Sequence, residues 1–153
     1  MSKQIPVAVV TGAAGDLGQN LIQRLRREGW RVIAADIAAD KAGKDPIAVE
    51  QLVETAAAKG SFRLWVNAAG IFHVGPVADA TLDDWHRIIA VNLTGTFNGC
   101  RAALPRLEAG GRIINISSIA GQTGVTGIHP AYGASKAGVQ SLTAVYGKEG
   151  AKR

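Results

Sequence analysis

The sequence predicts an α/β fold, in which a doubly wound parallel sheet carries helices on both faces and so forms three layers, α/β/α. Apolar, β-branched runs typical of strands buried on both faces alternate along the chain with longer segments of helical pattern. Such alternation indicates right-handed crossovers between parallel strands. The length of 153 residues suits one domain with a sizeable core.

Four strands are expected, in the sheet order 2-1-3-4 counted along the chain. They are residues 5–11 (IPVAVVT), 31–36 (RVIAAD), 63–67 (RLWVN) and 112–117 (RIINIS). Helices are expected at 17–28, 47–59, 81–107 and 132 to about 148. The third of these opens with TLDD, an N-cap followed by first-turn acids, and Pro105 should kink or stop it. The segment 37–46 (IAADKAGKDP) is expected to be a loop.

The composition excludes several classes of protein. Hydrophobic residues make up 47% of the chain and charged residues 19%, which is typical of a globular domain. The net charge is +5, but the basic residues are scattered and not interleaved with aromatic ones, so we expect no nucleic-acid partner. No apolar run approaches the roughly 20 residues that span a bilayer, and the first residues lack a signal-peptide layout, so no membrane association is expected. The single cysteine, Cys100, excludes an internal disulfide and favours the cytoplasm.

A glycine-rich turn, TGAAGDLG at 11–18, lies between the first strand and the first helix. Gly12 permits the sharp turn, Gly15 lets the backbone approach a pyrophosphate, and Gly18 allows the helix to lie close to the strand. The N–H groups and dipole of the helix N-terminus would then bind the phosphates. The alternative is a tight turn without a ligand. Asp16 should weaken phosphate binding unless it points outward or caps the helix.

Asp36 closes the second strand, 18 residues after Gly18. A carboxylate at this place can accept both hydroxyls of an adenosine ribose and would repel a 2′-phosphate. The sequence therefore favours NAD as cofactor, with NADP still possible. The alternative is an ordinary acidic residue of a strand-end loop.

Tyr132 and Lys136 lie four residues apart, and so on the same face of the last helix. A free phenol has a pKa near 10, too high for an efficient base at neutral pH, but a neighbouring ammonium favours the phenolate. Taken alone, such a pair is more often a packing pair. The phosphate-binding turn and the serine-bearing strand end upstream favour catalysis instead.

Five motifs follow one another in the chain: TGAAGDLG, NAAG (67–70), VNLTG (91–95), NISS (115–118) and YGASK (132–136). In this order they resemble the short-chain dehydrogenase/reductase family of the classical type, over about residues 5–149. The resemblance implies a Rossmann-like dinucleotide-binding domain spanning 1–153. It also implies NAD(P)-dependent interconversion of a secondary alcohol and a ketone. The segments RIINISSIAGQTG and SKAGVQSLT are most similar to 3-oxoacyl-carrier-protein reductases and to sugar- or polyol-oxidising relatives, although Asp36 leans against a biosynthetic reductase.

The resemblance also implies site residues and assembly. Tyr132 would be the acid and base, Ser118 would hold the substrate carbonyl, Asn92 would anchor a water of a proton relay, and Lys136 would also bind the nicotinamide ribose. The implied cofactor-binding residues are Gly12, Ala14, Gly15, Asp16, Leu17, Gly18, Asp36, Asn67, Ala68, Ala69, Gly70, Tyr132 and Lys136. Dimers or tetramers would form through the helix 81–107 and the tyrosine-bearing helix.

Some alternatives stay open at this point. The interval from Ser118 to Tyr132 is 14 residues, about one more than usual in the family, so Ser117 or a bulge near Gly127 is an alternative arrangement. The segment from Asn67 to Gly70 is expected to stabilise the sheet and to flank the adenine side. Three histidines, His73, His86 and His129, show no metal-ligand spacing, so no metal is predicted. His129 should be a loop surface residue, with a substrate-facing position as the alternative, and the tryptophans Trp30, Trp65 and Trp85 should pack in the core or between helices.

The chain departs from the family at two places. Only about 30 residues separate Asp36 from Asn67, where family members fit a helix, a further strand ending in an acidic residue and another helix. We therefore expect the strand beyond Asp36 to be lost. The family also continues beyond the position of Arg153, so the domain is expected to be incomplete at its C-terminus, with 112–117 as an open sheet edge. A fragment, a minimised protein and a domain completed by a partner chain all fit, and a dinucleotide-binding module without turnover is the alternative function.

Overall fold

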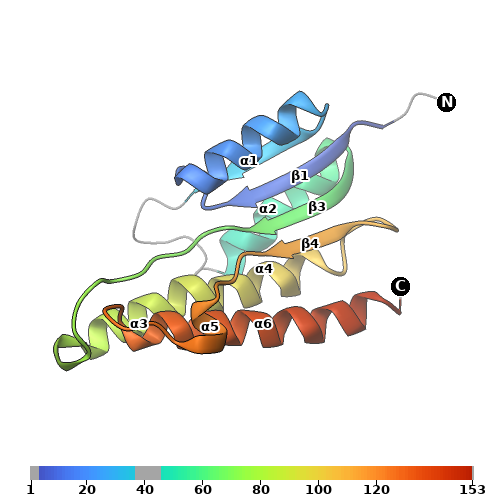
Figure 1. Cartoon of the computed structure of the whole chain (residues 1–153). Coiled ribbons are helices and arrows are strands. Elements are labelled where there is room, and N and C mark those ends of the chain that lie inside the picture. The colour runs from blue at the N-terminus through green and yellow to red at the C-terminus, as the bar shows by residue number, and fades with distance from the viewer. Residues whose placement is uncertain (1–3, 37–45, 153) are drawn as a thin grey trace.

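The sheet has four parallel strands in the order β2-β1-β3-β4, as the sequence predicts (Figure 1). The computed structural model describes residues 4–36 and 46–152. Within them the strands are β1 (Pro6–Thr11), β2 (Arg31–Ala35), β3 (Ser61–Asn67) and β4 (Arg112–Asn115). The carboxyl ends of parallel strands meet at one edge of the sheet, which brings the glycine turn, Asp36, NAAG and NISS together.

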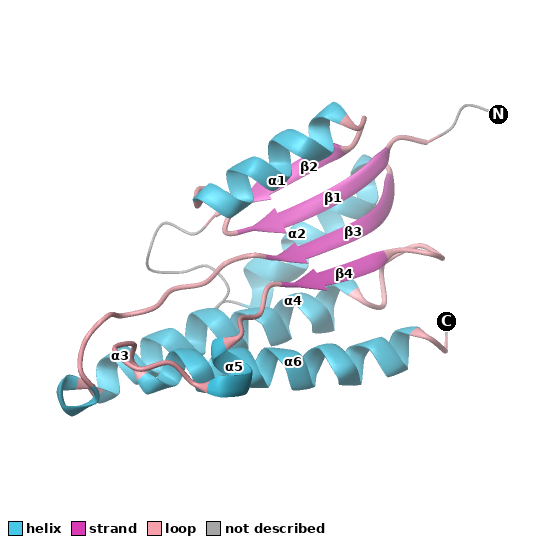
Figure 2. Cartoon of the chain, in the orientation of Figure 1, coloured by secondary structure: helices cyan, strands magenta, loops and turns pink. Residues whose placement is uncertain are grey.

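Helices cover both faces of this sheet (Figure 2). The main helices are α1 (Asp16–Arg27), α2 (Pro46–Lys59), α3 (Leu82–Ile89), α4 (Gly95–Ala103) and α6 (Pro130–Gly150). Three short segments join them: η1 (Val77–Asp79), η2 (Ala90–Thr94) and α5 (Ala120–Thr123). The α/β class and the three layers are thus confirmed.

Two apolar clusters form the core, one on each face of the sheet. On the first face, Val9 and Trp65 pack with Val53 of α2 and Ala103 of α4. On the second face, the alternate positions of the same strands turn toward α1, where Ile22 belongs to the same cluster as Val10, Leu64 and Val66. Because β1 and β3 are buried on both faces, their sequences are unbroken apolar runs.

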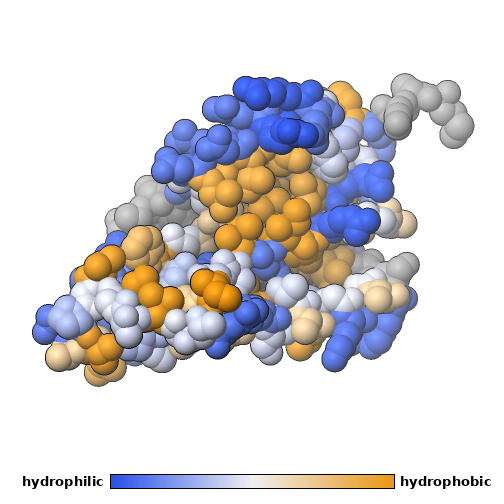
Figure 3. Space-filling model, viewed as in Figure 1, coloured by the Kyte–Doolittle hydropathy of each residue, from blue (hydrophilic) through white to orange (hydrophobic). Residues whose placement is uncertain are grey.

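The second face is covered by α1 over only part of its width. Apolar surface is visible between α1 and the strand β4 in the space-filling view (Figure 3). Ile114 of β4 is 44% exposed there. In the part of the chain that the structure describes, β4 pairs only with β3 and β2 only with β1, so the edge expected at 112–117 is open.

The long helix expected at 81–107 is divided into three parts. A turn of π-helix, η2, separates α3 from α4, and α4 ends at Ala103, before Pro105. The last helix begins at Pro130, two residues earlier than expected, because proline suits the first helical turn. The expected loop at 37–46 lies outside the described residues except for Pro46, which begins α2.

The tryptophans do not all pack as expected. Trp65 is fully buried and Trp30 is half-buried beside α1. The expectation for Trp85 is wrong, since its side chain is 38% exposed on α3.

Candidate active site

The glycine turn is built so that two of its glycines cannot be replaced without a clash. Gly12 has φ +68°, and a Cβ there would lie 2.6 Å from the backbone nitrogen of Ala69. A Cβ on Gly18 would lie 2.1 Å from the carbonyl oxygen of Gly12, so α1 packs directly on the turn. A Cβ on Gly15 would meet only one atom, at 3.5 Å. The turn is therefore tight on its inner side and open at Gly15, an arrangement that suits the approach of a phosphate group.

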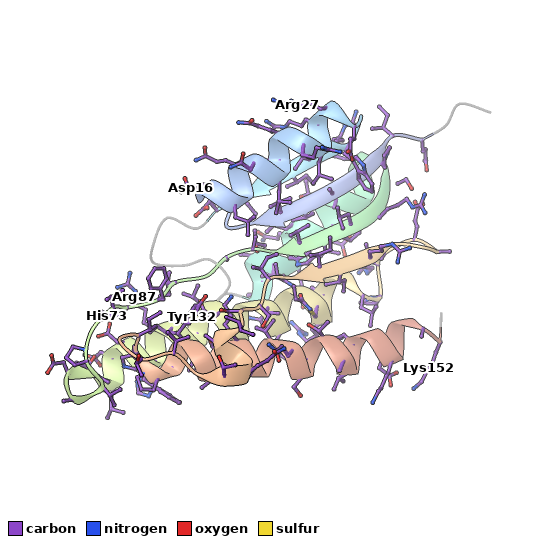
Figure 4. All side chains as sticks on the ribbon, viewed as in Figure 1. Asp16, Arg27, His73, Arg87, Tyr132 and Lys152 are labelled. Atoms are coloured by element: carbon purple, nitrogen blue, oxygen red, sulfur yellow. The ribbon has the colours of Figure 1, made fainter. Side chains whose placement is uncertain are left out.

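The two acidic residues expected at this turn occupy different positions. The Asp36 carboxylate accepts a hydrogen bond from the Ala14 backbone N–H (Oδ2 to N, 2.5 Å), which ties the end of β2 to the turn. Asp16 is exposed in the first turn of α1, at the end of the helix nearest the sheet edge (Figure 4). A carboxylate is favourable at a helix N-terminus. Phosphate binding requires that the Asp16 side chain either points outward or caps the helix, and its exposed position is the first of these arrangements.

The NAAG segment connects the glycine turn to the last helix. The Ala69 N–H lies 3.4 Å from the Thr11 hydroxyl oxygen, to which it donates, beside the contact with Gly12. At the other end of the segment, a Cβ on Gly70 would lie 3.4 Å from Lys136 Nζ. The sequence motifs at 11–18, 67–70 and 132–136 thus form one continuous surface at the carboxyl ends of the strands.

Asn67 lies beneath this surface and is only 4% exposed. Its Oδ1 accepts from Trp65 Nε1 at 2.7 Å, and its Nδ2 donates to Asn115 Oδ1 at 2.8 Å. The Asn115 amide in turn donates to the Thr143 hydroxyl of α6 at 2.9 Å. The side chain of Asn67 therefore joins β3 to β4, which agrees with the stabilising role expected for it.

Asn92 is fully buried within the π-turn η2. Its Oδ1 accepts from the Ile71 N–H at 2.8 Å, and its Nδ2 donates to the Ile71 carbonyl oxygen at 2.9 Å and to Ser135 Oγ at 3.1 Å. The amide thus holds the chain that follows NAAG against the last helix, next to Lys136.

Lys136 lies with its ammonium group in the interior, at 4% exposure. Nζ donates to the Ile116 carbonyl oxygen at 2.7 Å and lies 5.8 Å from the centre of the Tyr132 ring. Burial lowers the pKa of the Lys136 ammonium from its ordinary value. Tyr132, labelled in Figure 4, is half-buried. Its ring meets the Phe72 ring edge-on, with 5.8 Å between ring centres.

The two serines after β4 have different partners. Ser117 Oγ donates to the Lys136 carbonyl oxygen at 2.9 Å and accepts from Gln140 Nε2 at 3.2 Å, so it attaches the strand end to α6. Ser118 is half-buried, and its Oγ accepts from the Ala120 N–H at 3.2 Å. A hydroxyl that accepts one hydrogen bond still has its own proton to donate. Of the two, Ser118 has the hydroxyl better suited to a substrate carbonyl.

His129 is a structural residue that the sequence does not reveal. It is 6% exposed, so the expected surface position is wrong. Its Nδ1 accepts from the Ala131 N–H at 3.1 Å and caps α6. Because that nitrogen is an acceptor, Nε2 carries the proton and donates to the Thr81 carbonyl oxygen, 3.1 Å away. His129 therefore joins the beginnings of α6 and α3, and only the His-Pro pair at a helix start hints at this.

A cavity of about 470 Å³ lies on the other side of the NAAG segment, at the ends of β1, β2 and β3. Asp36, Asn67 and Ala69 line it together with Leu52 of α2 and Thr96 of α4. Within residues 4–36 and 46–152, no three His, Cys, Asp or Glu side chains are grouped closely enough to hold a metal ion. Nor does any helix in these ranges have the length and apolar character needed to cross a membrane.

Comparisons with known proteins identify the family. A family profile described as short chain dehydrogenase matches residues 43–153. A trans-4-hydroxycyclohexanecarboxylate dehydrogenase of Sinomonas cyclohexanicum is 39% identical over 90% of this chain and 63% of its own length. A 3-alpha-(or 20-beta)-hydroxysteroid dehydrogenase of Mycobacterium bovis is 39% identical over 90% of this chain and 60% of its own length.

The fold agrees with this match. The crystal structure of a short chain dehydrogenase from Mycobacterium avium superposes with a TM-score of 0.86 at 27% identity, covering 96% of this chain and 66% of that one. The chain spans 60–63% of the length of the two curated relatives above. Profile, relatives and fold agree, and the chain belongs to the short-chain dehydrogenase family.

Proposed function

We propose that this chain binds NAD along the carboxyl ends of its strands and interconverts a secondary alcohol and a ketone, with Tyr132 as the acid and base. One observation carries the proposal: Ala68 and Ala69 of the NAAG segment pack against Gly12, and the next residue, Gly70, lies so near Lys136 that a Cβ on it would be 3.4 Å from Nζ. A dinucleotide laid along this surface would have its phosphates at the glycine turn and its nicotinamide beside Tyr132.

The cofactor site has a chemically suitable set of groups. The pyrophosphate would lie against the glycine turn, where the open side of Gly15 leaves room and the first turn of α1 offers N–H groups. The residues that would surround it are Gly12, Ala14, Gly15, Leu17 and Gly18. Asp16 is exposed and would lie at the border of this phosphate site.

The adenosine end would lie on the other side of the turn. The Asp36 carboxylate would accept ribose hydroxyls and disfavour a 2′-phosphate, so NAD is preferred over NADP. The cavity lined by Asn67 and Ala69 would take the adenine, with Ala68 and Gly70 completing the wall toward the nicotinamide.

The catalytic residues would move one proton. When bound, the nicotinamide cofactor supplies or accepts the hydride. In reduction, the Tyr132 hydroxyl gives its proton to the carbonyl oxygen of the substrate while the carbonyl carbon gains the hydride, so a ketone becomes an alcohol. Ser118 donates a hydrogen bond to the same oxygen. Oxidation of the alcohol reverses both transfers.

Lys136 would act as an electrostatic and positioning group. An ammonium has three N–H donors, and one of them is used by the Ile116 carbonyl oxygen. The remaining two are available to the ribose hydroxyls and to the phenolate side of Tyr132, whose ring lies 5.8 Å from Nζ. Asn92 holds the Ile71 backbone next to this group, and a relay water at Asn92 remains a prediction from the family resemblance.

The finer assignments are part of the same proposal. Likeness to 3-oxoacyl-carrier-protein reductases remains a prediction from the segments RIINISSIAGQTG and SKAGVQSLT. A homo-oligomer, a small-molecule alcohol or ketone as the partner and a cytoplasmic location also remain predictions.

A second candidate function is a dinucleotide-binding module without turnover. The observation in its favour is that the cavity lined by Asp36, Asn67 and Ala69 is separate from the cavity lined by Tyr132. Binding of NADH and its oxidation are therefore tested as two separate properties.

Two measurements on the 153-residue chain test the proposal. A titration of NADH followed by its fluorescence measures binding, and the loss of NADH absorbance with a panel of ketones measures turnover. Tyr132→Phe keeps the ring and removes only the hydroxyl, so it should lower turnover by about 10²- to 10⁴-fold, the usual contribution of a general acid, and change NADH binding far less. Binding without oxidation of NADH by any ketone would favour the module, and turnover that survives Tyr132→Phe would contradict the assigned role.

A further inference from the structure

Two loops that lie far apart in the sequence are fixed to each other beside Tyr132. The His129 N–H donates to the His73 carbonyl oxygen at 2.9 Å, and the Gly75 N–H donates to the Gly127 carbonyl oxygen at 3.0 Å. Val74 and Ile128 form an antiparallel bridge between these two contacts. The chain at 72–77 and the chain at 124–129 therefore form one rim, called here the Tyr132 rim, directly before the helix that carries Tyr132.

The Tyr132 rim presents apolar side chains to solvent. Phe72 is 61% exposed and stands edge-on to the Tyr132 ring, while Val77 is 63% and Val125 47% exposed. Ile119, next to Ser118, is 64% exposed as well. Exposed apolar residues that gather around a reactive group indicate a binding surface more strongly than the same residues scattered singly.

A cavity of about 430 Å³ opens between the Tyr132 rim and the start of α6. Val77, Val125, Ile128 and Pro130 line it together with Tyr132 and several glycines and alanines. Among its described lining residues, none is Asp, Glu, Lys or Arg, and only Tyr132 and His129 bring polar side-chain atoms. Both ring nitrogens of His129 already have partners, Ala131 and Thr81, so the phenol hydroxyl is the polar side-chain group that a ligand would meet.

We infer that the substrate is a neutral ketone or alcohol whose body is mostly hydrocarbon and bulky enough to fill this cavity. This inference rests on the proposed function and names its substrate class. A hydrocarbon body would cover Val77, Val125 and Ile128, while its one oxygen would meet the Tyr132 hydroxyl. A polyol or a keto acid would instead lose hydrogen bonds to water while finding almost no polar side chain in the lining.

The experiment measures binding apart from turnover. The isotope-labelled 153-residue chain is titrated with 2-decalone or with dihydroxyacetone, a bulky hydrocarbon ketone and a small polar one, and NMR follows the methyl signals. We expect 2-decalone to shift the signals of Val125 and Ile128, with an affinity at least about tenfold higher than that of dihydroxyacetone.

A matched pair of variants locates the site. Val125→Asp places a carboxylate in the cavity lining and should weaken 2-decalone binding by about tenfold or more. Ile5→Asp makes the same kind of change at a side chain of similar exposure, 48%, before the start of β1 and so at the opposite end of the strand from the site. It should leave 2-decalone binding unchanged, and the spectra of both variants report whether the fold is intact.

The outcomes separate this inference from the proposed function. Binding of dihydroxyacetone as tight as that of 2-decalone, or equal effects of the two variants, would overturn the substrate class while NADH-dependent turnover could still stand. Absence of any ketone binding in a chain that binds NADH would overturn it too. Binding of 2-decalone that is sensitive to Val125→Asp, in a chain that does not bind NADH, would support the cavity and refute the dehydrogenase.

Discussion

Burial changes the proton affinity of two residues near the candidate site in opposite directions. It lowers the pKa of the Lys136 ammonium, because the charged form loses its contact with water. It raises the pKa of the Cys100 thiol from 9.0 to about 11, because the thiolate would be the charged form, and the hydrogen bonds that the sulfur makes with Asn115 and Asn67 only partly offset this. Cys100 is fully buried beneath the Asn67 amide, so its thiol should stay protonated in the folded chain at ordinary pH.

The Cys100 thiol should make the stability of the chain fall as the pH rises from 9 to 11. In this window the unfolded chain loses the thiol proton while the folded chain keeps it, so the free energy of unfolding decreases with pH. The decrease attributable to Cys100 should reach about 2 kcal/mol at most. Cys100→Ser removes the titration and keeps a small polar group for the two amides. Urea unfolding at pH 8, 9, 10 and 11 measures the difference between the two proteins.

The comparison cancels groups whose titration does not depend on Cys100, such as Lys136, whose pKa burial lowers in both proteins. The pKa of Tyr146 is raised mainly by burial and also by the charge of the Cys100 thiolate, so Cys100→Ser removes this second contribution as well. The difference in unfolding free energy between Cys100→Ser and the wild type should therefore move in favour of the variant above pH 9. Stability curves that stay parallel from pH 8 to 11 would show that the thiol is not protected.

Among the elements, α4 packs very closely on β3 beside the site. A Cβ on Gly99 would lie 2.3 Å from Asn67 Oδ1 and 2.6 Å from Trp65 Nε1. These two atoms are hydrogen-bonded to each other in the core. The helix can lie this close only because position 99 has no side chain.

Gly99→Ala should therefore destabilise the fold, although alanine is the better helix former. The added methyl group would force apart a buried hydrogen-bonded pair, and we expect a loss of about 2 kcal/mol or more in unfolding free energy. Gly147→Ala in α6 is the control, because nothing lies within 4 Å of a Cβ there. It should stabilise the chain by about 0.5–1 kcal/mol. Thermal and urea unfolding of the two variants should shift in opposite directions; similar shifts would mean that the packing at Gly99 is looser than the structure has it.

The elements differ in how far their sequence predicts them. The strands β1 and β3 can be predicted because both of their faces are buried and mostly apolar residues fit. The turn at 11–18 can be predicted because Gly12 and Gly18 are sterically required. The break of the long helix at η2 cannot be predicted from the sequence, because VNLTG contains no proline. In the structure Asn92 holds Ile71, which lies 21 residues earlier in the chain, and the π-turn places it there.

The candidate site, like the elements, can be predicted only in part from the sequence. The four-residue spacing places Tyr132 and Lys136 on one helix face, as the sequence indicates. The partner of Lys136 is a backbone carbonyl of Ile116, and that of His129 is the Thr81 carbonyl 48 residues away. Contacts to backbone atoms carry no signature in residue types, so the sequence predicts which residues gather but not how they are held.

In the whole molecule, the helices α3, α4 and α6 form an outer layer on the side of the sheet away from α1 (Figure 1). This layer carries several exposed apolar side chains: Leu82 (74%) and Trp85 (38%) on α3, Phe97 (40%) on α4 and Val145 (55%) on α6. Apolar side chains on adjoining helices are typical of a surface that a second subunit covers. The family resemblance implies dimers or tetramers through the same helices.

We therefore expect the chain to self-associate through α3, α4 and α6. Sedimentation velocity over a wide range of protein concentrations should give a dimer or tetramer that dissociates on dilution. Phe97→Asp would place a charge without a partner in the expected contact, and it should weaken association by about tenfold or more. Ile47→Asp on α2, where the side chain is 65% exposed, is the matched control and should sediment like the wild type. A wild-type chain that stays monomeric at every concentration, or equal weakening by both variants, would contradict an interface on this helical layer.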